Sequence, residues 1–245
     1  MSNKPGKGKV PFQVGGRTCA GSPGESLLEA LRRYGYEVPS LCHHEAVSAY
    51  GACRLCLVEV GKAGRRRLTT SCNYPVQEGI EVFLDTGKVV RHRRTVLQLL
   101  LAMAPGAERV REIARDYGVA DTPFKKDGDN GCILCGLCNR VCREIVGADA
   151  IGFASRGLDR KMTSPYDEEN EACIGCGACV YVCPTRCIGM REEENIRRID
   201  RWHRVLPMKA CRKCGRSFAP AFQLDAIAAR IGADRGTFDL CQDCR

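Results

Sequence analysis

A run of four closely spaced cysteines occurs twice in the second half of this chain. The two stretches, GCILCGLCNRVC and ACIGCGACVYVC, share the spacing C-x2-C-x2-C-x3-C. This spacing is typical of protein loops that wrap [4Fe–4S] clusters, whereas a structural zinc site needs a closed set of four ligands. The repeat therefore predicts a duplicated module that holds two cubane clusters, and this requirement constrains the fold of the chain more than any other feature.

The ligands of the two cubanes follow from the way such modules exchange their fourth cysteine. In two-cluster ferredoxins the last cysteine of each run ligates the cluster of the other run. The first cubane is accordingly assigned to Cys132, Cys135, Cys138 and Cys183. The second cubane is assigned to Cys142, Cys173, Cys176 and Cys179. Glycines beside these cysteines would let the backbone pass close to each cluster.

A different cysteine pattern, C-x10-C-x2-C-x15-C, lies in the first third of the chain and comprises Cys42, Cys53, Cys56 and Cys72. Three of these thiolates would share one loop and the fourth would follow a strand, so that all four can converge on a [2Fe–2S] cluster. A four-cysteine zinc site is the alternative, but such sites usually pair two CxxC knuckles. A Rieske site is excluded because no second box with a paired histidine follows. His43 and His44 are therefore expected to lie outside the ligand set.

Two further CxxC pairs lie near the C-terminal end and comprise Cys211, Cys214, Cys241 and Cys244. Two such knuckles are typical of a zinc ribbon, which predicts a tetrahedral zinc ion at this position. A single rubredoxin-type iron would suit the same four thiolates and stays open as an alternative. Between the pairs, Leu224, Ile227, Ala228 and Ile231 form an apolar stripe that predicts a helix. Cys19 and Cys187 are left over and are expected to be buried as small hydrophobic residues.

The hydrophobic periodicity around the first cysteine pattern predicts a β-grasp domain, in which a small mixed sheet packs on one helix. The expected elements are strands at 10–14, 17–20, 55–60 and 80–84 and a helix at 25–34. Two more helices are predicted after this domain, at 86–104 and 107–117. Residues 191–205 are charged and irregular, which predicts a linker.

These patterns together predict an α+β chain with four regions. The regions are a β-grasp [2Fe–2S] ferredoxin domain at 1–85, a helical connector at 86–120, a bacterial 2[4Fe–4S] ferredoxin domain at 121–200 and a four-cysteine zinc-ribbon-like module at 201–245.

The series PSLCHH, GACRLCLVEV and TTSC, together with the ferredoxin repeat, resembles a known family of iron–sulfur subunits. The family includes the N-terminal region of the largest peripheral subunit of respiratory complex I, the diaphorase small subunit of NAD-reducing hydrogenases, and related iron-only hydrogenases. The resemblance covers roughly residues 10–190 and implies a [2Fe–2S] cluster on a β-grasp fold. The phrases CRKCGRSFAP and CQDCR also resemble the tail of ferredoxin-like subunits of membrane-bound hydrogenase and formate hydrogenlyase complexes.

One departure from this family concerns a further cluster. The relatives usually carry an extra [4Fe–4S] cluster held by one histidine and three cysteines. This chain has no cysteine between Cys72 and Cys132, and Ala104-Pro105 stands where the ligand histidine before proline is expected. The extra cluster is therefore predicted to be missing, while its helical scaffold is retained.

The net charge of +9 would suit a nucleic-acid-binding protein if the cysteines stayed neutral. Four sites with four thiolates each carry about −2 apiece, however, which lowers the net charge to roughly +1. No nucleic-acid partner is therefore expected. The first residues contain no apolar leader, and no apolar run approaches the roughly 20 residues of a membrane span. A cytoplasmic protein that is at most peripheral to a membrane is predicted.

No GxGxxG after a strand, Walker loop or nucleophile with its base can be recognised, so flavin and nicotinamide are expected on a partner. We predict a non-catalytic electron-transfer subunit of an NAD(P)-linked oxidoreductase complex. It would relay single electrons between a flavin/NAD(P)H-binding subunit and a second catalytic redox subunit such as a hydrogenase or formate dehydrogenase. A redox-sensing iron–sulfur/zinc regulator and a free-standing polyferredoxin are the alternative hypotheses.

Overall fold

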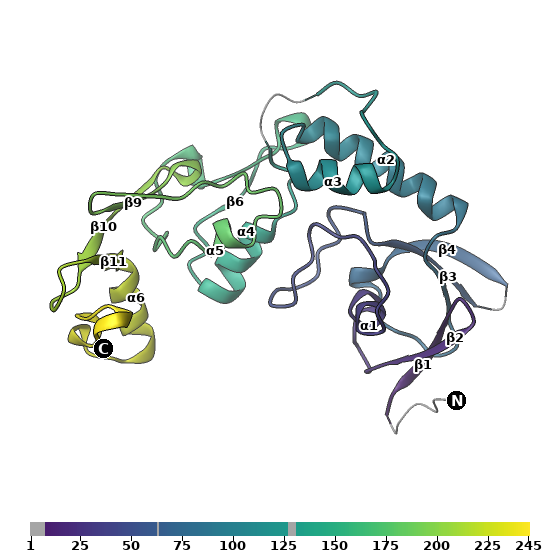
Figure 1. The fold of residues 1–245 in the computed structure, drawn as a ribbon, viewed down its shortest axis with the longest axis horizontal. Helices are drawn as coiled ribbons and strands as arrows, with labels where there is room; N and C mark the ends of the chain where they lie inside the picture. The colour runs from purple at the N-terminus through teal and green to yellow at the C-terminus, as the bar shows by residue number, and fades with distance from the viewer. Residues whose placement is uncertain (1–7, 63, 127–130) are drawn as a thin grey trace. The chain divides into compact units, whose positions relative to one another are not determined.

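The computed structural model describes residues 8–62, 64–126 and 131–245 (Figure 1). The chain divides into two compact units, Met1–Cys135 and Gly136–Arg245. Residues 1–7, which belong to the segment predicted to lack an apolar leader, lie outside the described residues. None of the helices in the described ranges is both long and apolar enough to cross a membrane.

The first unit is built on a five-stranded mixed sheet with the order β2-β1-β5-β3-β4. The strands are β1 (Val10–Val14), β2 (Arg17–Gly21), β3 (Leu57–Lys62), β4 (Arg65–Thr70) and β5 (Glu81–Phe83). β1 pairs antiparallel with β2 and parallel with β5, which confirms the predicted mixed sheet. The tight turn between β1 and β2 is made by Gly15 and Gly16, both at positive φ.

Strand β4 was not predicted from the sequence. Its first three residues are arginines with exposed side chains, so the strand shows no clear alternation of apolar and polar positions. β4 lies at the edge of the sheet, where charged side chains are common because they discourage pairing with other chains. An edge strand of this kind is difficult to recognise by hydrophobic periodicity.

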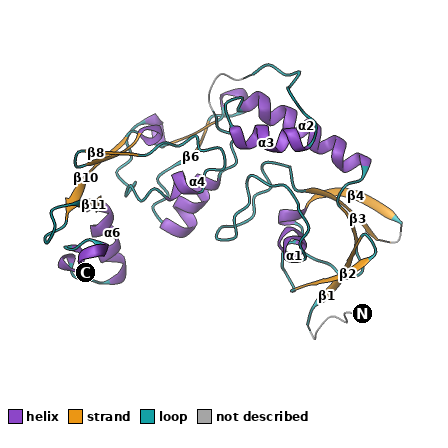
Figure 2. Cartoon of the chain, viewed as in Figure 1, coloured by secondary structure: helices purple, strands orange, loops and turns teal. Residues whose placement is uncertain are grey.

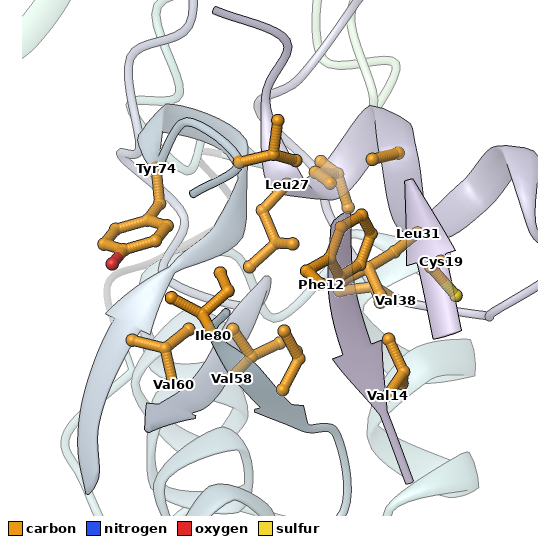
Figure 3. Close-up of a cluster of buried hydrophobic side chains, with 14 of the residues drawn as sticks. Phe12, Val14, Cys19, Leu27, Leu31, Val38, Val58, Val60, Tyr74 and Ile80 are labelled. Atoms are coloured by element: carbon orange, nitrogen blue, oxygen red, sulfur yellow. The ribbon is translucent and has the colours of Figure 1, made fainter. Parts of the chain in front are cut away.

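The core of the first unit lies between the sheet and helix α1 (Leu27–Arg33), as Figure 3 shows. A capping box starts the helix, because Ser26 accepts from the backbone of Glu29 and the Glu29 side chain accepts from the backbone of Ser26. Leu27 and Leu31 of α1 are fully buried beside Phe12 of β1. Cys19 is also buried in this cluster, as predicted.

Two helices, α2 (Gly87–Met103) and α3 (Glu108–Asp116), follow the sheet and pack on each other, as Figure 2 also shows. Their bounds agree with the predicted helices at 86–104 and 107–117. Thr86 caps α2 by accepting from the backbone N–H of Val89. Its hydroxyl also donates to the buried Glu59 carboxylate of β3 at 2.7 Å, so that the first turn of α2 is fixed to the sheet.

A buried arginine also ties α2 to the sheet. The guanidinium of Arg93, only 1% exposed, donates to the Leu57 carbonyl at 2.7 Å and to the Tyr117 hydroxyl at 2.8 Å. It also pairs with Asp85 at 3.2 Å. Since Leu57 follows Cys56 directly, Arg93 connects the helical pair to the strand that carries a predicted cluster ligand.

The second unit contains short helices and two small sheets. Its helices are α4 (Leu137–Arg140), α5 (Ala178–Tyr181) and α6 (Ala221–Ile231). A two-stranded sheet pairs β6 (Gly152–Ala154) with β7 (Lys161–Thr163), and a four-stranded sheet has the order β11-β10-β9-β8. The strands of the larger sheet are β8 (Arg191–Glu193), β9 (Ile196–Ile199), β10 (Arg204–Ala210) and β11 (Ser217–Pro220).

Single helical turns complete the described secondary structure. They lie at Ser71–Asn73, Val141–Val146, Gly157–Asp159, Pro165–Asp167, Asp200–Trp202, Arg235–Phe238 and Gln242–Cys244. The turn at Val141–Val146 continues α4 with the wider π geometry.

The predicted linker at 191–205 is wrong, because this stretch forms β8, β9 and the start of β10. Its charged residues lie mostly on the solvent side of the strands, whereas Ile199, Trp202 and Leu206 are buried. The apolar positions are too few and too irregularly spaced to show strand periodicity. Helix α6 confirms the helix predicted from the apolar stripe, with Leu224 and Ala228 buried.

Arg93 can be tested as the anchor of α2. We expect Arg93→Ala to lower the free energy of unfolding by about 3 kcal/mol, because it leaves buried acceptors without their donor. The nearby Arg91→Ala is the matched control, since the Arg91 side chain is exposed on the same helix. Urea unfolding followed by circular dichroism measures both. Equal unfolding midpoints for the two variants would contradict the anchoring role.

Candidate iron–sulfur and metal sites

The four cysteines of the first pattern are brought together in the first unit and are all buried, with at most 2% of each residue exposed. Cys42 and Cys53 lie on the loop between α1 and β3, and Cys56 directly precedes β3. Cys72 lies in the turn after β4. The pairing of Leu57 with Thr70 in the β3–β4 hairpin places Cys56 near Cys72. The backbone N–H of Ser71 completes this junction by donating to the Cys56 carbonyl at 3.0 Å.

The sulfur atoms of this set interact in two pairs. The backbone N–H of Cys53 donates to Cys42 Sγ at 3.4 Å, and hydrogen bonding with Cys42, together with burial, raises the pKa of the Cys53 thiol. The contact with Cys72 lowers the pKa of Cys56 to about 7, while the pKa of Cys72 is raised by the same contact. Two adjacent thiol pairs suit two tetrahedral irons, each of which takes two protein sulfurs.

The loop that carries this set depends on unusual backbone conformations. Gly51 has φ +71°, and a Cβ there would approach Asn73 Nδ2 to 3.1 Å. Arg54, between Cys53 and Cys56, also has positive φ. The backbone N–H of Leu41 points at the loop and donates to Cys53 Sγ at 3.3 Å. Backbone donors of this kind favour the thiolate that a cluster requires.

The two histidines beside Cys42 have partners outside the cysteine set. His43 Nε2 lies 3.7 Å from a carboxylate oxygen of Glu29. His44 Nδ1 accepts from the backbone N–H of Ala46 at 3.2 Å. Both contacts agree with the expectation that neither histidine is a ligand, which stays a prediction.

In the second unit, the four cysteines assigned to the second cubane line one apolar cavity. The cavity walls include Cys142, Cys173, Cys176 and Cys179, with Ile151, Ile174, Ile199 and Trp202 among the apolar residues between them. Burial raises the pKa of Cys142 and Cys173, and it raises that of Cys179 to about 12. The metal-free thiols are therefore protonated near neutral pH, so that binding of a cluster must release protons.

The ends of strands β9 and β10 hold this cavity. Arg204 Nε donates to the Cys173 carbonyl at 2.8 Å, and Arg197 donates to the Gly175 carbonyl at 2.7 Å. Gly175 has φ +71°, and a Cβ there would meet Leu206 of β10 at 2.3 Å. The indole N–H of Trp202, between the strands, donates to Cys179 Sγ at 3.3 Å. Sequence reasoning missed these residues, and only the single tryptophan within a charged stretch could have drawn attention to them.

The cysteines assigned to the first cubane fall on both sides of the boundary between the units. Cys132 and Cys135 end the first unit, whereas Cys138 and Cys183 belong to the second. The complete set stays a prediction from spacing. The leftover Cys187 is only half-buried, contrary to prediction, and its sulfur lies 3.6 Å from Cys183 Sγ.

The four C-terminal cysteines form a compact group in which all sulfur atoms lie within 4.8 Å of one another. The Sγ atoms of Cys214 and Cys241 are 3.8 Å apart, about the separation that tetrahedral metal–sulfur bonds of ~2.3 Å require. Backbone N–H groups, first that of Cys241, lower the pKa of Cys211 to about 6. The group can hold one tetrahedral ion, because a cubane places each ligand on a different iron and would spread the sulfurs further.

Comparison with known protein families supports the two kinds of cluster domain. A model described as a 2Fe-2S iron-sulfur cluster binding domain matches residues 7–87. Two models described as 4Fe-4S dicluster domains match residues 128–190 and 172–219. The second of these reaches Cys211 and Cys214, but the structure groups both with Cys241 and Cys244. The predicted [2Fe–2S] and two-cubane domains are thus confirmed at the level of domain type.

Curated relatives extend this comparison to whole subunits. The chain is 31% identical to a subunit of the NADH-quinone oxidoreductase of Rhizobium meliloti over 66% of its length, and 32% identical to the alpha subunit of the NADPH-Fe(3+) oxidoreductase of Geobacter sulfurreducens over 72%. It is 30% identical to the HndD subunit of the NADP-reducing hydrogenase of Solidesulfovibrio fructosivorans over 72%. The chain is a relative of the iron–sulfur subunits of NAD(P)-linked oxidoreductases. This relationship confirms the family resemblance predicted from the cysteine series.

The chain spans only part of these relatives, since the alignments cover 22%, 23% and 35% of their lengths. A solved structure described as NAD+-reducing [NiFe]-hydrogenase in the H2-reduced state has a similar fold, with a TM-score of 0.56 and 22% identity. The similarity covers 87% of this chain and 93% of that one. The fold is therefore shared over nearly the whole chain.

The C-terminal group can be tested by removing one ligand. We expect Cys241→Ser to lose about one equivalent of the tetrahedral ion and to expose residues 211–244 to proteolysis, because the buried Cys241 has no equivalent replacement. The visible absorption of the iron–sulfur clusters should be unchanged. Cys19→Ala is the matched control and should retain every metal. Full metal content in Cys241→Ser, measured by inductively coupled plasma mass spectrometry, would contradict the assignment.

Proposed function

We propose that this chain conducts single electrons, through one [2Fe–2S] and two [4Fe–4S] clusters, between a flavin/NAD(P)H-binding subunit and a second catalytic redox subunit. The observation that supports this most directly is the apolar cavity lined by Cys142, Cys173, Cys176 and Cys179 in a chain that also buries a second cysteine quartet. When bound, iron–sulfur clusters supply one-electron redox chemistry. The protein's own contribution is to bind them, to exclude water and to orient hydrogen-bond donors toward their sulfurs.

The ligand sets of the proposal are those expected from spacing. Cys42 and Cys53 would hold one iron of the [2Fe–2S] cluster, and Cys56 and Cys72 the other, in line with the two pairs of interacting thiols. The cubanes would be held by Cys132, Cys135, Cys138 and Cys183 and by Cys142, Cys173, Cys176 and Cys179.

The C-terminal group of four cysteines would hold a structural zinc ion. Its close sulfur spacing suits a single ion, and strand β11 and helix α6 between the two knuckles would then be closed by the metal. A rubredoxin-type iron is the alternative. The regions 1–85, 86–120, 121–200 and 201–245 remain our proposed domains, although β9 and β10 pair across the last boundary.

The partners follow from the chemistry of the relatives. Their names include a nicotinamide substrate, whose oxidation delivers two electrons as a hydride, whereas a cluster accepts one electron at a time. A flavin-bearing subunit must therefore stand between the nicotinamide and this chain. Because the alignments cover about a quarter to a third of each relative, a hydrogenase, formate dehydrogenase or similar unit would be a separate partner here. Reduced thiols and a nicotinamide couple also favour the cytoplasm.

The proposed order of electron flow can be tested in a reconstituted complex. We expect NADH to reduce all three clusters of the oxidised chain only when a flavin-bearing NADH dehydrogenase subunit is present. Cys72→Ala should lose about two irons, because it removes a ligand of the [2Fe–2S] cluster. It should also abolish NADH-driven reduction of the cubanes, while dithionite still reduces them.

Cys19→Ala is again the matched control, because this buried thiol belongs to none of the ligand sets. It should behave as the unaltered chain. Undiminished reduction of the cubanes by NADH in Cys72→Ala, observed by rapid-freeze EPR, would contradict entry through the [2Fe–2S] cluster. Failure of NADH to reduce any cluster through a competent flavin subunit would contradict the function itself.

A further inference from the structure

The only tryptophan of the chain lies in the wall of the cysteine-lined cavity of the second unit. Trp202 is 1% exposed and ends the short helical turn Asp200–Trp202 between β9 and β10. Its indole N–H donates to Cys179 Sγ at 3.3 Å. A buried indole N–H usually finds a hydrogen-bond acceptor within the protein, so its orientation toward a sulfur atom requires an explanation.

We propose that Trp202 is a positioning residue that raises the reduction potential of the cluster held by Cys142, Cys173, Cys176 and Cys179. The inference rests on the proposed function, because it requires that these cysteines bind a [4Fe–4S] cluster. It goes further in giving one non-ligand side chain a defined effect on one of the three clusters.

The physical basis is the interaction of a fixed dipole with a change of charge. Reduction adds one negative charge to the cluster and its thiolates, and an N–H group directed at a ligand sulfur stabilises the more negative state. The cavity is apolar, so this interaction is weakly screened. The same indole donor lowers the pKa of Cys179 against the larger opposing effect of burial, which shows that it favours negative charge on this sulfur.

The position of the indole is fixed by the strands on either side of it. Ile199, the last residue of β9, is buried and pairs with Arg204 at the start of β10. The guanidinium of Arg204 is bonded both to the Cys173 carbonyl, at 2.8 Å, and to Glu169, at 2.7 Å. The turn that carries Trp202 is thereby attached to the loop that carries the predicted ligands. A donor held in this way costs little reorganisation when the charge of its acceptor changes.

The decisive variant is Trp202→Phe, which retains an aromatic ring but removes the N–H donor. We expect one [4Fe–4S] reduction step to shift to a more negative potential, with the [2Fe–2S] step and the other [4Fe–4S] step unchanged. Redox titration followed by EPR resolves the steps. Tyr181→Phe is the matched control, because Tyr181 lies on α5, close in sequence to Cys179, but is 87% exposed. It should leave all three steps in place.

A second measurement keeps the test decisive if Trp202→Phe fails to fold or to bind its clusters. Because the chain has one tryptophan, growth with 5-fluorotryptophan alters this side chain alone. The fluorine makes the indole N–H a stronger donor, so the same step should shift to a more positive potential. Opposite shifts in the two proteins would support the proposal.

A fully loaded protein in which neither change moves a [4Fe–4S] step would overturn the role of Trp202 and leave the proposed function intact. Absence of iron and sulfide from the unaltered protein would instead overturn the proposed function. The two failures are therefore distinguishable in the same samples.

Discussion

The structure depends on the requirement that sulfur atoms from distant parts of the sequence meet in places that water cannot easily reach. Thiolates are costly to bury without a metal or hydrogen-bond donors, and burial raises the pKa of Cys179 to about 12. The fold offsets this cost locally with backbone N–H groups, such as those of Leu41 and Cys53, and with the Trp202 indole. These cysteine sets are thus built together with donors that make them able to bind a cluster.

The elements around these sites act mainly as clamps on irregular loops. In the first unit, Arg93 joins helix α2 to the carbonyl of Leu57, one residue beyond Cys56. In the second unit, Arg197 and Arg204 of adjacent strands bind carbonyls of the Cys173–Cys176 loop. Buried or half-buried arginines therefore account for part of the basic excess in the sequence. This use of positive charge agrees with the expectation that the net charge does not indicate a nucleic-acid partner.

The sequence predicted the features that depend on local spacing and failed for those that depend on tertiary contacts. Cysteine spacing identified the cluster domains, and hydrophobic periodicity identified α1, α2, α3 and the β1–β2 hairpin. Strand β4 was missed because its arginines lie on an exposed edge, and residues 191–205 were taken for a linker because charged side chains cover a strand pair with few buried residues. The contact of Trp202 with Cys179 joins residues 23 positions apart, and no local pattern encodes it.

The central claim is that sixteen of the 18 cysteines hold three clusters and one tetrahedral ion. Anaerobic metal and sulfide analysis, combined with EPR of the reduced protein, tests this most directly. We predict about ten irons, about ten acid-labile sulfides and about one zinc per chain, with signals from one [2Fe–2S] and two [4Fe–4S] clusters. About eleven irons without zinc would make the C-terminal ion a rubredoxin-type centre. Two irons or fewer, with zinc in their place, would contradict the account.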